Sequence, residues 1–591
     1  MSSIQRLFAS AIVLLSLLLV HPHSVRATTV TIDDSTGAQK QVIDGFGTSV
    51  NDDGAKDWYQ KAYYDDMGCS IMRMDITPQF VGPYSDHAYN SPWYGNPAPL
   101  EIDDPSSPGG PEKNNVRTYT GPDDYTRDFG GSKAQIAVMG PDIDKNIAYF
   151  DYSKLTAQGA MAQAGLSRKA QLGDFKLFAS VWSPAPWLKV ADGQKWDNGG
   201  GGNLPAKGTP YPFIWGANFV GGKLDTSDQP LDVFNDGSGP TSALTQFARG
   251  IAAFVKGFQD KYSVNFYAIS IQNELNFPKL TNTCDYATSP EYIAALKAVR
   301  KEFDQHPELK DIQLVGPEDV LGTDPYFMWQ LGGGNSPVTH KNLQYLVNIQ
   351  KDTDAAAAES FFCIHGYASD GATAVGAESK PWSWWADGWT SSPSAGLPDV
   401  VPGFTSYSKK SWMTEAGGES AAWLDPGTGY PGNGAWSIAL KMQQALTAGQ
   451  ESACLYSQFA EKDDSTTASC LSRGTNTTME PKYVAAKHFI KYIRPGAVAV
   501  GASVDDTNGV TASAFLHQQN HTLTIVLVNK NSAPDVTSVQ LPDDFNTVQS
   551  VKTVTSSHDS LWKESTASPT QGLIQVSVPG YGIVTLVAQG S

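Results

Sequence analysis

Eight short apolar segments, with helical segments between several of them, constrain the fold of this chain most strongly. They lie at residues 42–48 (VIDGFGT), 70–77 (SIMRMDIT), 176–182 (KLFASVW), 266–273 (FYAISIQN), 312–316 (IQLVG), 360–365 (SFFCIH), 411–414 (SWMT) and 453–459 (ACLYSQF). Such near-continuous apolar runs are typical of strands buried on both faces of a parallel sheet. Residues 243–262, 290–303 and 436–448 show helical periodicity ahead of the fourth, fifth and eighth runs. This alternation predicts right-handed βαβ units, and eight of them predict a (β/α)8 barrel.

The pattern changes near residue 495, where helical periodicity stops. Short alternating segments follow at residues 509–516, 522–528, 547–554 and 582–587. They predict a small antiparallel β-sandwich. Residues 28–42 also alternate, so we expect an N-terminal strand that joins the sandwich. The predicted fold is therefore α/β, with a TIM barrel at residues 43–494 and an attached sandwich at residues 495–591.

The first 27 residues have the pattern of a secretion signal. Arg6 supplies positive charge, residues 7–20 are apolar, and residues 25–27 (VRA) offer small residues for cleavage after Ala27. An uncleaved anchor is the alternative, but the apolar run is shorter than the about 20 residues of a spanning helix. The pattern predicts a secreted protein with no membrane contact after cleavage.

Charge and cysteine content exclude several classes of partner. The formal net charge is −18 at pH 7, which argues against nucleic acid and against an anionic membrane surface. The cysteines show no metal-ligand spacing, so we expect no metal and no cofactor. An exported protein can form disulfides. Cys284 and Cys470 lie in polar segments and are the candidate pair, whereas Cys69, Cys363 and Cys454 are expected as buried thiols.

Long insertions follow the second, third and sixth predicted strands, at residues 80–145, 190–240 and 368–410. Loops after the strands of this kind of barrel build its active sites. The last insertion contains four tryptophans, Trp382, Trp384, Trp385 and Trp389. These tryptophans could form a platform for a sugar ring or a packed loop.

Two predicted strands end in a glutamate. Residues 269–277 (ISIQNELNF) reach Glu274, and residues 412–419 (WMTEAGGE) reach Glu415. One carboxyl could protonate a glycosidic oxygen and the other could attack an anomeric carbon, although Glu415 could instead cap the next helix. Glycoside hydrolysis needs two carboxylates, about 5–5.5 Å apart in retaining and about 6.5–9.5 Å apart in inverting enzymes. Because these residues end the fourth and seventh strands, we expect them to face each other across the barrel mouth.

The order of these motifs resembles glycoside hydrolase family 30, whose members are retaining (β/α)8-barrel enzymes with a C-terminal β-sandwich. The resemblance rests on residues 43–47 (IDGFG), Arg73, Asn273, Glu274, Glu415 and residues 489–496 (FIKYIRPG). It covers nearly the whole mature chain and implies that Glu274 is the acid/base and Glu415 the nucleophile. The sequence departs from the family at Leu275, where proline is usual, and at residues 416–419.

The resemblance also implies five substrate-binding residues. These are Asn273, which would hold the sugar 2-hydroxyl, Arg73 beside the nucleophile, Trp182 on the third strand, and His365 and Tyr367 at the end of the sixth. The residues alone leave other interpretations open. Arg73 could form an ion pair with Asp75 or Asp44, and His365 and Trp182 could be buried core residues.

The expected function is that of a secreted, monomeric, retaining β-glycoside hydrolase. The family acts on xylan, β-1,6-glucan and β-1,6-galactan, and long loops would suit such a polysaccharide. The alternatives are a non-catalytic carbohydrate-binding protein, a glucosylceramidase-like enzyme, and an inverting or metal-assisted hydrolase. In the xylanase branches of the resembled family, the region after strand eight binds a glucuronate carboxylate. Arg473 and Lys482 are candidates for that role.

Overall fold

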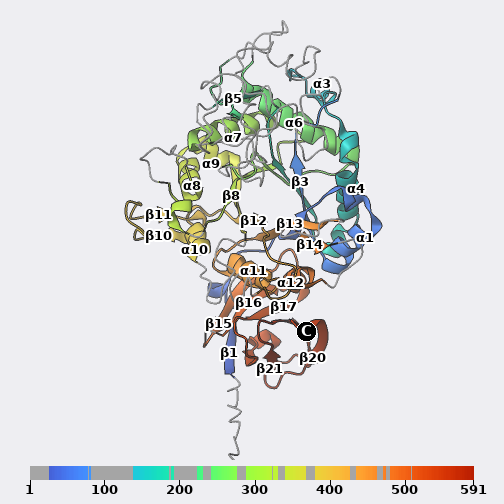
Figure 1. Ribbon diagram of the computed structural model, residues 1–591, viewed down its shortest axis with the longest axis vertical. Coiled ribbons are helices and arrows are strands. Elements are labelled where there is room, and N and C mark those ends of the chain that lie inside the picture. Colours follow the sequence, from blue (N-terminus) through green and yellow to red (C-terminus); the bar gives the residue numbers. More distant parts are fainter. Residues whose placement is uncertain are drawn as a thin grey trace, which may run out of the picture.

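Eight parallel strands close a barrel in the computed structural model (Figure 1). They are β2 (Gly45–Ser49), β3 (Ile71–Ile76), β4 (Lys176–Val181), β7 (Ala268–Ser270), β8 (Gln313–Val320), β9 (Glu359–His365), β12 (Ser411–Glu415) and β13 (Ala453–Glu461). Each strand pairs in parallel with the next, β13 returns to β2, and the pair Met413–Cys454 joins β12 to β13. The predicted barrel is confirmed, with each of the eight strands overlapping one of the eight apolar segments.

The structure describes residues 26–77, 79–81, 137–185, 188–191, 222–229, 241–275, 286, 288–322, 324–330, 340–367, 380–425, 434–461, 470–473, 480–506 and 509–590. The predicted signal segment before residue 26 and Cys284 lie outside these ranges. The proposed Cys284–Cys470 disulfide is therefore untested. Cys69, Cys363 and Cys454 are buried, as expected. Among the described residues, every helix is too short or too polar to cross a bilayer.

Helices surround the barrel in Figure 1. The longer ones are α4 (Thr156–Ser167), α6 (Ala243–Tyr262), α7 (Ser289–Phe303), α8 (Asn342–Lys351), α11 (Ser437–Thr447) and α12 (Pro481–Ile490). Shorter ones are α1 (Asp57–Gln60), α3 (Ile143–Ile147), α5 (Lys169–Leu172), α9 (Thr353–Ala358) and α10 (Lys380–Asp387). The side chain of Thr288 and that of Glu291 form a capping box that, with Pro290, begins α7.

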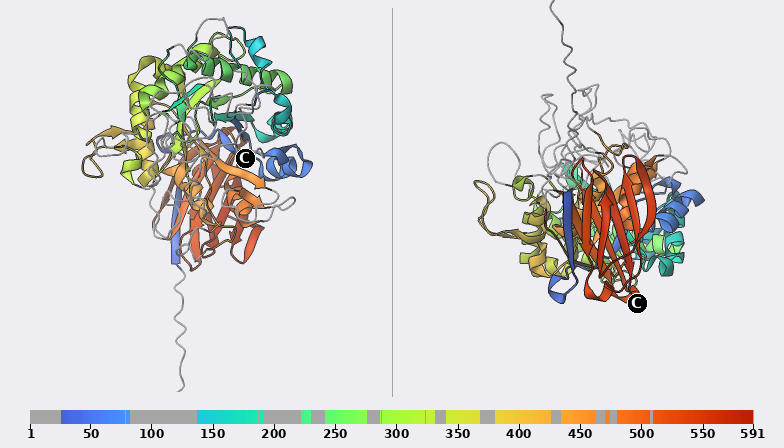
Figure 2. Two further views of the ribbon diagram at one scale, coloured as in Figure 1. Left: turned by 45° about the horizontal axis from the view of Figure 1, so that its top comes forward. Right: turned by 90° about the horizontal axis from the view of Figure 1, so that it is seen from below.

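The C-terminal region forms a β-sandwich with its own apolar core (Figure 2). Its strands are β1 (Arg26–Asp33), β15 (Val498–Val504), β16 (Val510–His517), β17 (Thr522–Asn529), β18 (Asp535–Gln540), β19 (Val551–Ser557), β20 (Ser560–Ala567), β21 (Leu573–Val578) and β22 (Ile583–Gln589). The pairings are antiparallel except that of β1 with β18. The N-terminal strand thus lies between β15 and β18, far from its place in the sequence.

Helices α11 and α12 lie between the barrel and the sandwich (Figure 1). On α11, the Gln443 side chain donates to the backbone oxygen of Val526 at 3.2 Å. On α12, both ring nitrogens of His488 meet hydroxyl oxygens of the sandwich, those of Thr585 and Ser556, at 2.8 and 2.7 Å. These buried polar contacts fix the sandwich against the outer helices of the barrel.

Apolar side chains fill the barrel interior toward the N-terminal ends of its strands. One buried cluster consists of Ile71, Phe178, Ala268, Val315, Phe361, Cys363, Trp412, Ala453 and Leu455. Below it, Lys410 donates to Asp44 at 2.6 Å and Trp412 donates to the same carboxylate at 2.8 Å. The barrel interior is therefore a packed core, and a polar site is confined to the opposite, C-terminal ends of the strands.

Three shorter strand pairings lie beside the barrel. Strand β14 (Cys470–Arg473) pairs in parallel with β13. Two hairpin-like pairs lie in the insertions: β5 (Lys189–Ala191) with β6 (Gly222–Leu224), and β10 (Gly388–Trp389) with β11 (Val401–Pro402). Within the described parts of the insertions, both pairs follow barrel strands at their C-terminal ends.

Candidate active site

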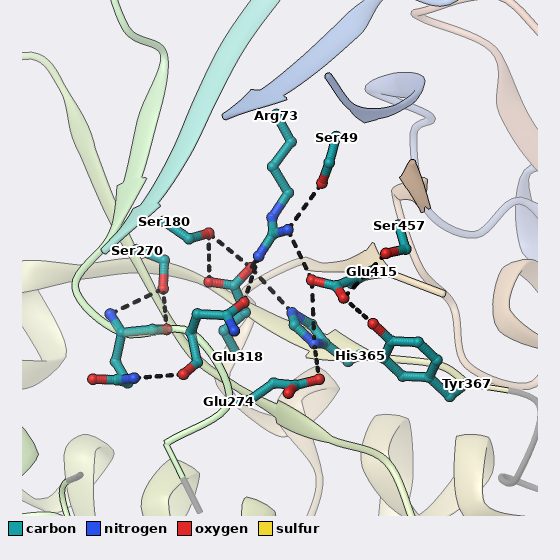
Figure 3. A network of polar contacts seen from close by, with 12 residues as sticks. Ser49, Arg73, Ser180, Ser270, Glu274, Glu318, His365, Tyr367, Glu415 and Ser457 are labelled. Atoms are coloured by element: carbon teal, nitrogen blue, oxygen red, sulfur yellow. Dashed lines mark hydrogen bonds and ion pairs between the residues drawn. The ribbon is translucent and has the colours of Figure 1, made fainter. Parts of the chain in front are cut away.

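Both predicted carboxylates lie at the C-terminal ends of barrel strands and point toward each other (Figure 3). Glu415 is the last residue of β12, and Glu274 follows β7 by four residues. Both residues are nearly buried, at 5% and 7% exposure. One oxygen of each carboxyl and a ring nitrogen of His365 lie within 4.8 Å of one another. The sequence therefore identified two acids that the fold brings into one small polar site.

Arg73 of β3 connects these residues. Its Nη1 donates to Glu415 Oε2 at 2.8 Å, and its Nη2 donates to Asn273 Oδ1 at 2.6 Å. The guanidinium is 1% exposed. Burial lowers the pKa of Arg73, but Glu318 and Glu415 outweigh that effect and raise it. The alternative of an ion pair with Asp44 is wrong, because Asp44 pairs with Lys410 at the other end of the barrel.

Glu415 is surrounded by hydrogen-bond donors. Besides Arg73, the hydroxyl of Tyr367 donates to Oε1, and the hydroxyl of Ser457 lies 3.4 Å from the same oxygen. Burial, with the charges of Glu274 and Glu318, keeps the pKa of Glu415 above its usual value, although His365 and Arg73 act against that rise. Three donors around one carboxyl group favour its ionised form. This is the protonation state that a nucleophile requires.

His365 joins the acid/base candidate to a further carboxylate. Its Nδ1 lies 2.9 Å from Glu274 Oε1, and its Nε2 lies 3.2 Å from Glu318 Oε1. The ring is fully buried. Burial lowers the pKa of His365, but Glu415 and the hydrogen bonds to Glu274 and Glu318 raise it to about 10. His365 is thus a member of the polar site and not an isolated core histidine.

Glu318 is the central residue that sequence reasoning missed. It lies in β8, fully buried, and accepts from Ser180 Oγ, which lies 2.9 and 2.8 Å from its two oxygens. Arg73 Nη2 also reaches Glu318 Oε1 at 3.1 Å. Burial alone would raise the pKa of Glu318, but Arg73 and His365 bring it down to about 2. The sequence signal was Pro317-Glu318-Asp319, three residues that continue β8 past the predicted strand end at Gly316.

The backbones of Glu274 and Glu318 share an unusual conformation. Their φ angles are 44° and 55°, in the left-handed region that non-glycine residues rarely adopt. The Glu274 N–H donates to the Glu318 backbone oxygen at 2.9 Å. Strained backbone of this kind concentrates at functional sites, where surrounding structure holds it in place. Here it turns two adjacent strand ends so that both carboxyl groups reach His365.

Comparisons with known proteins agree with this architecture. No family model and no curated protein matches the sequence. Among solved structures, a family 30 subfamily 8 xylanase from Clostridium acetobutylicum is 19% identical, with a TM-score of 0.56 over 95% of this chain and 100% of that one. A family 30 xylanase C catalytic domain from Talaromyces cellulolyticus is 15% identical, with a TM-score of 0.59 and the same coverage. The chain has the fold of glycoside hydrolase family 30.

An endo-β1,6-glucanase is also similar in structure: it is 13% identical at a TM-score of 0.55, over 95% of this chain and 94% of that one. At these identities the likeness concerns the fold. The role of each site residue therefore rests on its own geometry.

Asn273 is buried, and its oxygen faces Arg73. Trp182 directly follows β4 and is half-buried. Burial raises the pKa of Asp75, and a hydrogen bond from the Trp182 indole reduces that rise. Trp182 thus borders the network and is not part of the buried barrel core.

The tryptophans of the insertion after β9 lie in a described, packed segment. Trp382 and Trp385 are fully buried on α10, and Trp389 is nearly so. The Trp385 indole donates to Ser411 Oγ at 2.9 Å. Of the two interpretations that the sequence left open, the packed one holds for these three side chains. Trp384 is half-buried against the same cluster.

Lys482, a candidate for reading a glucuronate carboxylate, is buried below the loop after Glu415. Its Nζ donates to the Glu419 backbone oxygen at 3.0 Å and lies 5.5 Å from the ring centroid of Tyr456. Lys482 is 3% exposed, and its ammonium group is directed to these two neighbours. The side chain of Arg473 lies outside the described residues.

Three donor atoms, from Glu274, His365 and Glu415, are close enough to surround a cation. Positive charge already occupies two of these three positions. Arg73 is bound to Glu415, and the pKa of His365 is raised to about 10, so its ring holds a proton where a metal would need a lone pair. The donor set therefore fits protons and hydrogen bonds better than a divalent metal.

Proposed function

We propose that this protein is a retaining β-glycoside hydrolase. The observation that carries the proposal is the separation of the two carboxyl groups, with oxygens of Glu274 and Glu415 within 4.8 Å of each other. Retaining glycosidases hold their carboxylates about 5–5.5 Å apart, whereas inverting enzymes leave about 6.5–9.5 Å for a water molecule. The short separation supports direct attack by one carboxylate.

The surroundings of the two acids support different roles. Glu415 accepts from Arg73, Tyr367 and Ser457, and we assign it as the nucleophile. Glu274 lies beside His365, which can exchange a proton with it, and we assign it as the acid/base. Because the environments of the two carboxyl groups differ, one can stay ionised while the other beside it donates a proton.

The reaction would proceed by double displacement. Glu274 protonates the glycosidic oxygen while Glu415 attacks the anomeric carbon, and a glycosyl ester with Glu415 forms. Glu274 then takes a proton from water, which attacks the same carbon and releases the sugar with its configuration retained. Asn273 would present its amide to the 2-hydroxyl, with its oxygen held by Arg73.

We further propose a secreted, monomeric enzyme that acts on a polysaccharide of the xylan, β-1,6-glucan or β-1,6-galactan type. Two structurally similar proteins are named as xylanases and one as an endo-β1,6-glucanase. Another is described as a conserved exported protein from Bacteroides fragilis, with a TM-score of 0.59 at 13% identity. Product analysis on the three polysaccharides would identify the linkage that is cut.

The decisive experiment follows the anomeric configuration. Hydrolysis of an aryl β-glycoside is monitored by proton NMR, and the first-formed product should be the β-anomer. A 2-deoxy-2-fluoro glycoside should label the protein, and peptide mapping should place the label on Glu415. An α-anomer as first product would overturn the retaining mechanism, and inactivity on all aryl glycosides and all three polysaccharides would favour a non-catalytic binding protein.

Glu415→Gln is the matched test of the nucleophile. We expect it to lower kcat/KM by about 10³-fold or more, because a covalent step is lost. Glu451→Gln is the control. Glu451 is also fully buried, and burial raises its pKa well above the usual value, so glutamine closely resembles its protonated form. Loss of activity in both variants would point to a general effect of altering a buried acid.

A further inference from the structure

His365 has a carboxylate oxygen at each ring nitrogen. Glu274 Oε1 lies 2.9 Å from Nδ1, and Glu318 Oε1 lies 3.2 Å from Nε2 (Figure 3). A neutral imidazole has one N–H and one lone pair. If both acids were ionised and the ring were neutral, a lone pair would face a negatively charged oxygen at hydrogen-bond distance. The site therefore requires either a doubly protonated ring or a proton on one of the acids.

The contacts of Glu318 decide which nitrogen always carries hydrogen. Glu318 accepts from Arg73, which does not lose its proton, and from the hydroxyl of Ser180. Arg73 and His365, acting against burial, lower the pKa of Glu318 to about 2, so it is ionised at any working pH. An ionised carboxylate can only accept. Nε2 must therefore donate, and Nδ1 is the nitrogen that can gain or lose a proton toward Glu274.

We propose that Glu318 is a positioning residue that fixes the Nε2–H form of His365, and that His365 Nδ1 supplies the catalytic proton to Glu274 and takes it back. This inference deepens the proposed glycosidase function and rests on it. Glu318, His365 and Glu274 would act as a proton relay from β8 through β9 to the acid/base. The arrangement resembles a catalytic triad, in which a carboxylate orients a histidine toward a third group.

The groups that face His365 come from five strand ends. They are Glu274 after β7, Glu318 in β8, Tyr367 after β9, Glu415 of β12 with an oxygen 3.8 Å from Nδ1, and Arg73 of β3, which binds both Glu318 and Glu415. Three acids thus surround two cations. This excess of negative charge agrees with the raised pKa of His365, about 10, and keeps the ring doubly protonated in the resting site.

The proton balance is complete within the relay. In the first step the leaving oxygen takes the Glu274 proton as its bond to the anomeric carbon breaks, and Glu415 forms the ester. Glu274 is then recharged from Nδ1, which leaves His365 neutral with hydrogen on Nε2. In the second step Glu274 first returns its proton to Nδ1 and then takes the proton of the water that attacks the anomeric carbon, as the ester bond to Glu415 breaks.

Glu318→Gln tests the relay through the leaving group. A 2,4-dinitrophenyl glycoside departs without protonation, whereas a phenyl glycoside needs the general acid. We expect kcat/KM on the phenyl glycoside to fall by about 100-fold, with less than about threefold change on the dinitrophenyl glycoside. The alkaline limb of the phenyl pH profile should also move to lower pH. Equal losses on both substrates, with an unshifted profile, would reduce Glu318 to a structural role and overturn the proposal.

Nitrogen NMR tests the same relay without any substrate. Protein labelled with ¹⁵N-histidine is titrated, and His365 is assigned by the signal lost in His365→Asn. We expect both ring nitrogens to stay protonated well above pH 7 and Nε2 to keep its proton longest. A ring that titrates near 6.5, or one that keeps hydrogen on Nδ1, would overturn the relay even if Glu318→Gln does not fold. An inactive wild-type enzyme with the expected spectrum would contradict the glycosidase proposal and leave the proton arrangement standing.

Discussion

Arg73 Nη1 and Glu415 Oε2 lie 2.8 Å apart, with both side chains almost fully buried. The pair joins β3 to β12, the second and seventh strands of the barrel. Arg73 also reaches Ser49, Asn273 and Glu318, so one guanidinium orders groups from four other strand ends. Its positive charge is what allows two ionised carboxylates to be buried so close together.

Arg73→Met should therefore damage both folding and activity. Removing one partner of a buried ion pair typically costs about 3–5 kcal/mol, because the remaining charge stays buried without compensation. We expect a loss of that size in the free energy of unfolding, measured by urea denaturation, together with loss of hydrolysis. Arg168→Met is the control: Arg168 pairs with Asp65 near the surface, and its loss should cost less than about 1 kcal/mol. Similar losses in both variants would contradict a special role for Arg73.

The loop after Glu415 is held by a second buried ion pair. Lys441 Nζ lies 2.5 Å from Glu419 Oε1 and 3.1 Å from the Gly417 backbone oxygen, and Tyr456 donates to Glu419 Oε2. Burial would raise the pKa of Glu419, but Lys441 and Lys482 outweigh burial and lower it. These contacts hold residues 416–419 against the barrel and thereby support Glu415.

A double-mutant cycle should reveal this pair. Glu419→Gln alone should lower the free energy of unfolding by about 3–5 kcal/mol, since it leaves Lys441 charged and buried. Adding Lys441→Met should recover a large part of that loss. The exposed pair Lys552–Glu564 is the control, and Glu564→Gln should change stability by less than about 1 kcal/mol. Additive effects of the two buried substitutions would show that Glu419 and Lys441 do not stabilise each other.

Much of this architecture could be predicted from sequence because its main signals are local. The barrel strands are short apolar runs, and α6 begins and ends at the predicted residues, 243 and 262. The acids Glu274 and Glu415 stand where apolar runs end abruptly, so their position at the barrel mouth follows from strand order. Strands β16, β17, β19 and β22 of the sandwich were also predicted, from their alternating residues.

The remaining features depend on contacts that the local sequence does not encode. The apolar run ends at Gly316, so Glu318 was not recognised as part of a strand. Its charge is buried inside β8 because Arg73 and Ser180, both distant in sequence, bind it. Strand β20 has mostly exposed or half-exposed side chains and shows little alternation. Lys482 was assigned to the site from its place after strand eight, but its ammonium group is directed to the Glu419 backbone oxygen.

The glycines of the IDGFG motif have a packing role that can be tested. An added Cβ at Gly47 would lie 1.7 Å from the Ile71 backbone oxygen, so β2 and β3 could not keep their spacing. We expect Gly47→Ala to lower the free energy of unfolding by about 3 kcal/mol or more. Gly250→Ala, in α6, is the control because nothing lies within 4 Å of its added Cβ, and it should raise stability by about 0.5–1 kcal/mol. Tolerance of alanine at Gly47 would contradict this account of the motif.

The junction between barrel and sandwich should be sensitive to acid. His488 is fully buried there, and burial, followed by the charge of Lys487, lowers its pKa from 6.5 to about 3. A folded pKa below the unfolded one means that the unfolded chain binds the proton more readily. The contribution of His488 to stability is then complete above about pH 6.5 and is lost as the pH falls toward 3.

His488→Gln should remove this part of the acid sensitivity. Glutamine can still hydrogen-bond to Thr585 and Ser556 but does not titrate, so the variant should lose less stability than the wild type between pH 6.5 and pH 3. The difference should reach at most about 5 kcal/mol. Urea unfolding at several pH values, followed by tryptophan fluorescence, measures it. The same substitution at His558, which is exposed in the turn between β19 and β20, should leave the pH dependence unchanged. Parallel curves for wild type and His488→Gln would mean that acid loosens the junction through other groups.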